Sequence, residues 1–345
     1  MAIPRSNEAA NRSFLAGETI AERPSLSLTD CAGFPIDRTW MSIKTRILLF
    51  VFALGGFLPY SHLGQSQRPD KEYKLTVDVN LISVTVTVTR EDGTWVPDLA
   101  ASDFRVFDDG IEQKISLFGR ESDQPLQLCL LFDSSFSISP ELKTQQEAAI
   151  EFLKSTLRPV DRVTVLRISE EVDEMIHKTN QMERLVEAIR SIKPGGGTSL
   201  YDGVFLASEI LRSSKGRRVI LVISDGTDTT SHTKFQDCVK KAQNSESVVY
   251  SLIVQPIKSE PGRNLAGEHA MMYLSGRTGG RYFGVSLSDN FRASFETISQ
   301  ELRTQYVIGY YPQDSSPRDY RKIEVRVDNP AFQVRARDGY FVSVR

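Results

Sequence analysis

The stretch Leu128-Cys-Leu-Leu-Phe-Asp-Ser-Ser-Phe-Ser-Ile-Ser139 decides the fold of this chain. Its first five residues are apolar without a break, which is typical of a strand that is buried on both faces of a sheet. The strand continues directly into an oxygen-rich loop in which Asp133, Ser135 and Ser137 occupy alternate positions. A buried strand that ends in three oxygen-bearing side chains indicates a binding site at that end.

Apolar strands alternate with amphipathic helices on the carboxyl side of this stretch. The pattern predicts strands at residues 126–132, 162–168, 218–223 and 248–254. It predicts helices at residues 141–157, 181–192, 200–212, 233–244, 268–278 and 289–303, the first of them capped by Ser139 and opened by Pro140. Residues 123–303 are therefore predicted to form an α/β domain, with a doubly wound, mostly parallel sheet between helices.

Both segments that flank this domain have β patterns. Residues 73–122 alternate apolar and polar side chains, with a phase slip near Leu81 and Ile82 that predicts a bulge or break, and with Asp109-Gly110 as hairpin chemistry between residues 104–107 and 111–118. Residues 304–345 return to strands separated by turn clusters. Because neither segment buries much surface alone, we expect one β-sandwich into which the α/β domain is inserted. Two small separate appendages are the alternative.

The amino-terminal residues have the pattern of a targeting signal. Residues 41–67 combine a basic start, an apolar run at 47–58 and a small, polar tail, as in a secretory signal peptide. An uncleaved anchor is the weaker interpretation, because the apolar run is shorter than the roughly 20 residues that span a bilayer. Residues 1–40 lack periodicity, so we interpret them as an unstructured extension or a mis-assigned start, with Met41 as the true start. The expected location is secreted, periplasmic or in the cell envelope, with membrane association only through an uncleaved signal.

Charge and cysteine content exclude several classes of protein. The formal net charge is −2, so no overall field favours nucleic acid, and the basic residues of the carboxyl-terminal β segment are expected on a solvated sheet face. Three scattered cysteines, Cys31, Cys129 and Cys238, are too few for a disulfide framework or a zinc cluster.

Three loops are expected to meet at the carboxyl edge of the parallel sheet. They are residues 133–137, the glycine-rich residues 195–202, and residues 224–228 after the strand 218–223. Their candidate ligands are carboxylates and hydroxyls only. Such an all-oxygen set selects a hard cation, which predicts Mg²⁺, with Mn²⁺ or Ca²⁺ as competitors.

These three loops, in this order, resemble the metal-ion-dependent adhesion site of von Willebrand factor type A domains. The resemblance covers residues 75–342, and its flanking segments 103–110 and 337–340 are similar to a group of secreted bacterial proteins known as VWFA-related. By residue, the resemblance implies a metal site of Asp133, Ser135, Ser137, Thr198 and Asp225. The two serines and the threonine are direct or near-direct ligands, and the two aspartates are ligands or acceptors for metal-bound water. The resemblance places Asp202 beside the site without direct coordination, and Asp228 is expected to be a cap or a solvated neighbour in preference to a ligand.

One departure concerns Phe136, where the family usually has glycine. A bulky side chain there either points outward or strains the loop. The sequence leaves open whether Phe136 anchors a partner or packs within the loop.

The function that follows is a protein-binding, adhesion-type module, in which an Asp or Glu of a protein partner completes the metal coordination. One alternative is an envelope scaffold that binds through its β-sandwich and has a vestigial metal site. An Mg²⁺-dependent phosphohydrolase of the haloacid-dehalogenase type is disfavoured, because Ser135 stands where that chemistry needs a second carboxylate. The chain also lacks a Gly-x-Ser-x-Gly elbow, so we do not expect an enzyme.

Overall fold

The computed structural model describes residues 81–120, 123–136, 142–255, 264–286, 290–314, 316 and 318–342. All of them belong to the unit Tyr73–Arg345. The expected extension 1–40, the expected signal 41–67, the alternating residues before Leu81, the residues Ser137, Ser139 and Pro140, and Cys31 lie outside the described part.

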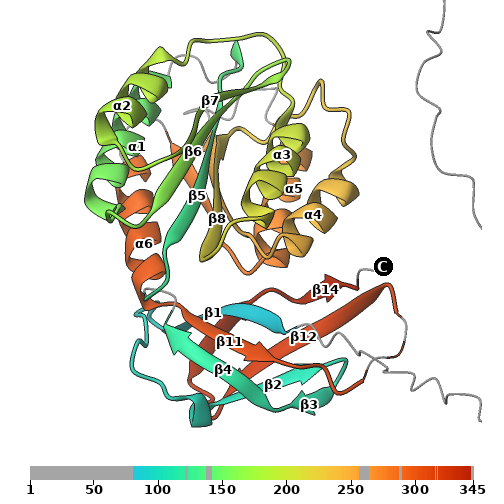
Figure 1. The fold of residues 1–345 in the computed structure, drawn as a ribbon. Coiled ribbons are helices and arrows are strands. Elements are labelled where there is room, and N and C mark those ends of the chain that lie inside the picture. The colour runs from blue at the N-terminus through green and yellow to red at the C-terminus, as the bar shows by residue number, and fades with distance from the viewer. Residues whose placement is uncertain are drawn as a thin grey trace, which may run out of the picture. The chain divides into compact units, whose positions relative to one another are not determined.

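A six-stranded sheet forms the centre of the α/β domain (Figure 1). Its strand order is β10-β9-β8-β5-β6-β7, and every neighbouring pair is parallel except β6 with β7. The predicted doubly wound, mostly parallel α/β fold is therefore confirmed. The strands are β5 (Leu126–Asp133), β6 (Arg162–Ile168), β7 (Val172–Thr179), β8 (Arg217–Ser224), β9 (Val248–Gln255) and β10 (Tyr282–Ser286).

Helices cover both faces of this sheet, as Figure 1 shows. Alternate residues of β5 point to opposite faces, so that Leu128 and Leu130 join one apolar cluster while Cys129 and Leu131 join another. The first cluster includes the buried sides of α1 (Leu142–Thr156), α2 (Met182–Ser191) and α6 (Asn290–Thr304), and the second those of α3 (Leu200–Arg212), α4 (Phe235–Asn244) and α5 (Leu265–Arg277). All six helices match the predicted ones within three residues at each end.

Two strands of the sheet were not predicted. β7 pairs antiparallel with β6 at one edge, and only one of its eight residues is buried, so it lacks the continuous apolar run of a central strand. β10 at the other edge is only five residues long and contains Gly284. The apolar-run criterion finds buried central strands and overlooks short, partly exposed edge strands.

The flanking β segments form two four-stranded sheets, with strand orders β13-β1-β11-β4 and β14-β12-β2-β3. Each sheet contains strands from both segments, since β1 pairs with β11 and β13, and β12 pairs with β2. One apolar cluster includes residues from both sheets. The strands are β1 (Ile82–Arg90), β2 (Phe104–Asp108), β3 (Ile111–Gln113), β4 (Ile115–Arg120), β11 (Tyr306–Tyr310), β12 (Tyr320–Val327), β13 (Phe332–Ala336) and β14 (Gly339–Phe341).

The hairpin at Asp109-Gly110 is confirmed, because β2 and β3 pair across these two residues and both have positive φ, 49° and 83°. The single strand predicted for residues 111–118 is wrong. The chain breaks at Lys114, and β3 and β4 belong to different sheets. The apolar pattern of the sequence gives no sign of this switch between sheets.

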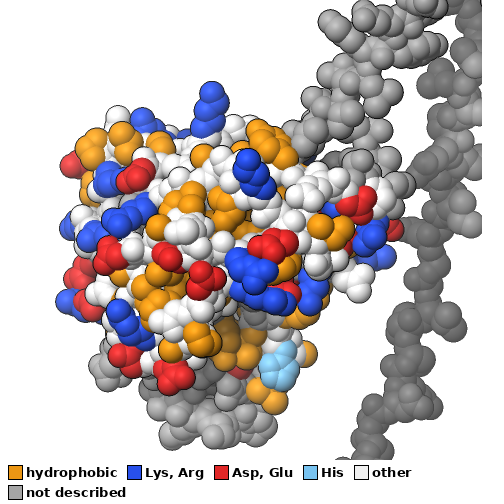
Figure 2. All heavy atoms as spheres, turned by 90° about the horizontal axis from the view of Figure 1, so that it is seen from below, with side chains coloured by type: hydrophobic (Ala, Val, Ile, Leu, Met, Phe, Trp, Pro, Cys, Tyr) orange, Lys and Arg blue, Asp and Glu red, His pale blue; other side chains and the backbone are white. Residues whose placement is uncertain are grey.

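The basic residues of the carboxyl-terminal segment are not all on a solvated face. Arg326 is half exposed beside Glu324, as expected, but Arg321 and Arg337 are buried, at 3% and 7% exposure. Figure 2, which views the molecule from below, shows Lys and Arg side chains interspersed with Asp and Glu side chains. Charges of both signs on one face do not form the single-sign field that steers association with nucleic acid.

Candidate metal centre

The candidate site lies where the connections of the parallel sheet change direction. β5 stands between β6 and β8, and the chain runs from β5 to β6 on one side before it adds β8 on the other. Ligands of such sheets bind outside the carboxyl ends of the strands at this point. Asp133 is the last residue of β5 and Ser224 the last of β8.

Asp133 has a completely buried carboxylate at this point. Its Oδ2 accepts a hydrogen bond from the Ser224 hydroxyl at 2.6 Å, and its Oδ1 accepts one from the Ser135 backbone N–H at 2.9 Å. Burial, with a smaller contribution from the negative charge of Asp225, raises the pKa of Asp133 to about 6 in spite of these hydrogen bonds. A buried carboxylate next to a second carboxylate favours a proton or a cation beside it.

The loop after β5 is held against β6 by Ser134. Both the backbone N–H and the hydroxyl of Ser134 donate to the carbonyl of Ile168, at 2.9 and 3.0 Å. This hydroxyl is therefore committed to β6. Ser135, at 4% exposure, stays next to the Asp133 carboxylate, whereas Ser137 lies outside the described residues.

Phe136 is 70% exposed. This exposure agrees with one of the two roles that the sequence leaves open, an aromatic ring that contacts a partner.

The glycine-rich loop approaches the first loop closely. The Gly195 N–H donates to the Ser134 carbonyl at 2.7 Å. A Cβ on Gly195 would lie 2.9 Å from the Cβ of Ser169, and one on Gly197 would lie 2.8 Å from the Thr230 Cγ2. Contacts this short exclude a side chain, so the glycines let the backbone pass between the neighbouring loops.

The glycine-rich loop also joins the loop after β8. The Thr198 carbonyl accepts hydrogen bonds from the Thr229 and Thr230 N–H groups at 2.8 and 3.1 Å, and the Thr198 N–H donates to the Thr229 hydroxyl at 2.9 Å. Asp225 is partly exposed in this third loop and accepts from the Thr227 N–H at 2.8 Å. With the bond between Ser224 and Asp133, each of the three predicted loops is hydrogen-bonded to the other two.

Asp202 accepts hydrogen bonds from backbone N–H groups just after the third loop. Its two carboxylate oxygens accept from the His232 and Thr233 N–H groups at 2.9 and 2.8 Å. Burial acts to raise the pKa of Asp202, but these hydrogen bonds outweigh it and the pKa is lowered. The residue therefore fixes the path of the loop into α4.

Asp228 caps a helix. Its Oδ1 accepts from the Tyr201 N–H, in the first turn of α3, at 3.2 Å and from the Ser231 hydroxyl at 2.6 Å. A carboxylate at this end of a helix satisfies a free N–H and interacts favourably with the helix dipole. The expectation of a cap agrees with this geometry.

Ser224 is the residue of this site that the sequence reasoning missed. It donates to Asp133 and accepts from the Gly226 N–H at 3.0 Å, so it connects two loops. The available signal was a hydroxyl residue at the end of a central strand, next to Asp225. Serine is so common at strand ends that this signal is weak.

Within the described residues, no three histidine, cysteine, aspartate or glutamate side chains converge to hold a metal ion. The predicted set has a different composition, with two carboxylates and several hydroxyls. None of the described helices is both long and apolar enough to span a membrane. Cys129 and Cys238 are buried free thiols whose pKa is raised by burial.

Residues 128–227 match the family model described as the von Willebrand factor type A domain. The α/β domain is related to von Willebrand factor type A domains. The match begins at Leu128 and ends at Thr227, so it includes the first two loops of the site and all of the third except Asp228. This match confirms the resemblance to von Willebrand factor type A domains for residues 128–227.

Several solved bacterial structures are similar to about half of this chain. BatB from Bacteroides thetaiotaomicron is 18% identical, with 51% of this chain and 97% of BatB covered and a TM-score of 0.43. An aerotolerance-related membrane protein from Bacteroides fragilis is 18% identical, with 51% and 98% covered and a TM-score of 0.41. The von Willebrand factor domain of the type V pili tip protein Mfa5 from Porphyromonas gingivalis is 13% identical, with 51% and 94% covered and a TM-score of 0.43. No curated protein sequence matches the chain.

Proposed function

We propose that this protein is an extracytoplasmic, divalent-cation-dependent binding module whose type A domain contacts a protein partner. The observation that carries the proposal is the buried Asp133 carboxylate, at the point where three hydrogen-bonded loops meet. The proposed location outside the cytoplasm is supported by the signal-like residues 41–67.

The donor chemistry of the site fits Mg²⁺. Asp133 and Asp225 supply two carboxylates, and the hydroxyls of Ser135, Ser137 and Thr198 supply neutral oxygens, which suits a hard cation such as Mg²⁺, Mn²⁺ or Ca²⁺. A cation would also offset the cost of burying Asp133 beside a second negative charge. When bound, Mg²⁺ would offer an open coordination position to an incoming oxygen anion.

The partner that fits this position presents an Asp or Glu side chain. The chain's own residues hold the site for it: Ser134 fixes the first loop on β6, Asp202 fixes the third, and Asp228 caps α3.

The proposal is tested by calorimetric titration of Mg²⁺ into the purified chain. We expect binding heat that disappears in Asp133→Ala and Ser135→Ala. Ser116→Ala, at an exposed serine of β4, is the control and should bind as the parent does. No heat in the parent protein would refute the metal site. Capture of a partner from an envelope extract that survives chelation would instead support the scaffold alternative.

Phe136 gives a second prediction. Because this side chain is 70% exposed, Phe136→Ala should leave the free energy of unfolding within about 0.5 kcal/mol of the parent. We expect partner binding to weaken by about tenfold or more, since exposed aromatic residues beside a binding site are frequent hot spots. Urea denaturation and a binding isotherm with the captured partner measure the two quantities. Lost stability with unchanged binding would show that the ring packs within its loop.

A further inference from the structure

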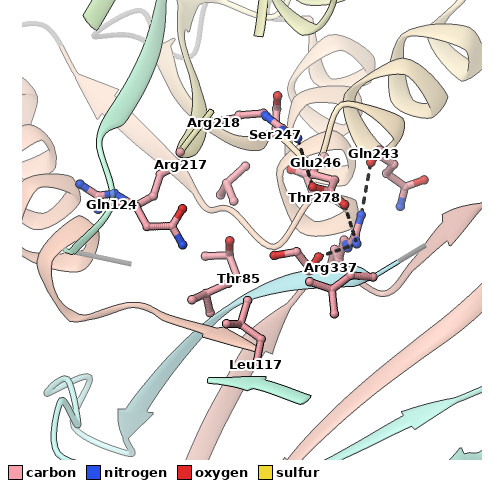
Figure 3. A pocket seen from close by; sticks show the side chains of 15 residues that line it. Thr85, Leu117, Gln124, Arg217, Arg218, Gln243, Glu246, Ser247, Thr278 and Arg337 are labelled. Atoms are coloured by element: carbon pink, nitrogen blue, oxygen red, sulfur yellow. Dashed lines mark hydrogen bonds and ion pairs between the residues drawn. The ribbon is translucent and has the colours of Figure 1, made fainter. Parts of the chain in front are cut away.

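A second pocket lies at the opposite end of the sheet from the candidate metal centre. It is a cavity of about 210 Å³ between the amino ends of β8 and β9 and the strands β1, β4 and β11 of the sandwich (Figure 3). Polar groups lining it include Ser83, Arg218, Glu246 and Arg337, and its apolar wall includes Leu117 and Val307.

Arg337 is the most informative residue of this cavity. Its side chain is 7% exposed, and its two terminal nitrogens donate to backbone carbonyls, Nη2 to Ser83 at 2.5 Å and Nη1 to Gln243 at 3.4 Å. Its Nε is buried and has no hydrogen-bond partner. In Figure 3 the guanidinium lies beside Thr278 and Glu246 at the edge of the cavity. A buried cationic donor that is left unpaired is costly, so the Arg337 guanidinium is incompletely satisfied within the chain.

The acidic side chain nearest to Arg337 is shared with a second arginine. The Arg218 Nη1 donates to Glu246 at 3.1 Å, whereas the Arg337 Nη2 lies 3.7 Å from the same carboxylate. Two guanidinium groups thus face one carboxylate in a partly enclosed space. The two guanidinium groups carry two positive charges, and the Glu246 carboxylate balances one of them. The remaining positive charge attracts an anion more strongly there than at an open surface.

The size and walls of the cavity restrict what this anion is. Since one water occupies about 30 Å³ of liquid, the space corresponds to about seven waters or a small organic molecule. Arginine donors match carboxylate or phosphate oxygens, and the apolar wall accepts a short carbon body. We propose that this cavity binds a small oxyanion, a carboxylate or phosphate group on a compact molecule, between the type A domain and the β-sandwich.

Such a ligand would bridge two parts of the chain. Arg218 belongs to β8 of the type A domain, and Arg337 follows β13 of the sandwich. A ligand that binds the folded chain but not the unfolded chain raises the apparent stability of the protein as the ligand concentration increases. The site is independent of the metal centre, so chelation should leave it unchanged.

The test uses succinate, butyrate and inorganic phosphate as separate probes, titrated into the purified chain with chelator present and at constant ionic strength. We expect a saturable rise in Tm and calorimetric binding for at least one probe, and the probe that binds identifies the carboxylate or phosphate class. Arg218→Gln and Arg337→Gln should each weaken binding at least tenfold.

Leu117→Trp tests the same cavity without removing charge, in case the arginine variants fail to fold. Leu117 is 42% exposed and lines the pocket, so a larger side chain should occupy its volume and weaken binding. Arg326→Gln, at a half-exposed arginine of β12, is the control and should bind as the parent does. The proposal is overturned if no probe binds at 10 mM or if all variants bind equally.

Discussion

Replacing Asp133 with asparagine should make the metal-free protein more stable at pH 7.5 while it abolishes Mg²⁺ binding. The carboxylate is completely buried, and its pKa is raised to about 6 by burial first and by Asp225 last. Asparagine keeps the shape and the acceptor for the Ser135 N–H without the charge. The expected gain is up to about 3 kcal/mol, from a pKa difference of roughly two units between the folded and unfolded states.

The pH dependence follows from the sign of this shift. A carboxyl whose folded pKa exceeds its unfolded value of 3.8 contributes stability that is present below pH 3.8 and is lost as the pH rises through about 6. The advantage of Asp133→Asn should therefore be largest above pH 6 and should mostly disappear by pH 4.5. Urea denaturation in chelator at both pH values measures this difference.

Magnesium provides the matching experiment. At a hundred times its dissociation constant, Mg²⁺ should stabilise the parent by about 2.7 kcal/mol and leave Asp133→Asn unchanged. Asp202→Asn is the control with the opposite sign, because the pKa of Asp202 is lowered, so this variant should lose stability at pH 7.5. Equal stabilisation of parent and Asp133→Asn by Mg²⁺ would contradict the assignment of Asp133 to the site.

The candidate site could be predicted from sequence to the extent that it follows from strand direction. Parallel strands place their carboxyl ends at one edge, so the neighbourhood of Asp133, Thr198 and Asp225 required only the recognition of their strands and loops. Which distant groups each carboxylate binds could not be predicted in this way. Asp202 and Asp228 occupy loop positions as suggestive as that of Asp225, yet their partners are N–H groups about 30 residues away.

Local sequence patterns also predict only part of the fold. Central strands and all six helices follow from local periodicity, whereas edge strand β7 and the switch from β3 to β4 depend on neighbours that are distant in sequence. The flanking segments 103–110 and 337–340 could be compared with other sequences, but their physical role required the structure. They meet in the sandwich, where Asp108 accepts a hydrogen bond from the Tyr340 hydroxyl at 3.0 Å.

Removing the Asp108 carboxylate should cause a large loss of stability. The side chain is fully buried, and it also accepts from the Tyr310 hydroxyl at 3.0 Å and from the Arg321 Nη1 at 3.2 Å. Burial, and then the charge of Asp108, raise the pKa values of both tyrosines. Asp108→Ala would leave a buried cation and two hydroxyls without this acceptor, so we expect a loss of about 3–5 kcal/mol in the free energy of unfolding.

A double-mutant cycle separates the ion pair from simple packing. Asp108→Leu combined with Arg321→Met replaces both charges with apolar side chains, so the double variant should be more stable than either single one, since no buried charge is left unpaired. Asp314, at 3.3 Å from Arg321 and partly exposed, only partly substitutes for Asp108. Glu112→Ala is the control, because its ion pair with Arg105 on the same sheet is half exposed, and its effect should be far smaller. Additive losses in the cycle would show that Asp108 and Arg321 are not coupled.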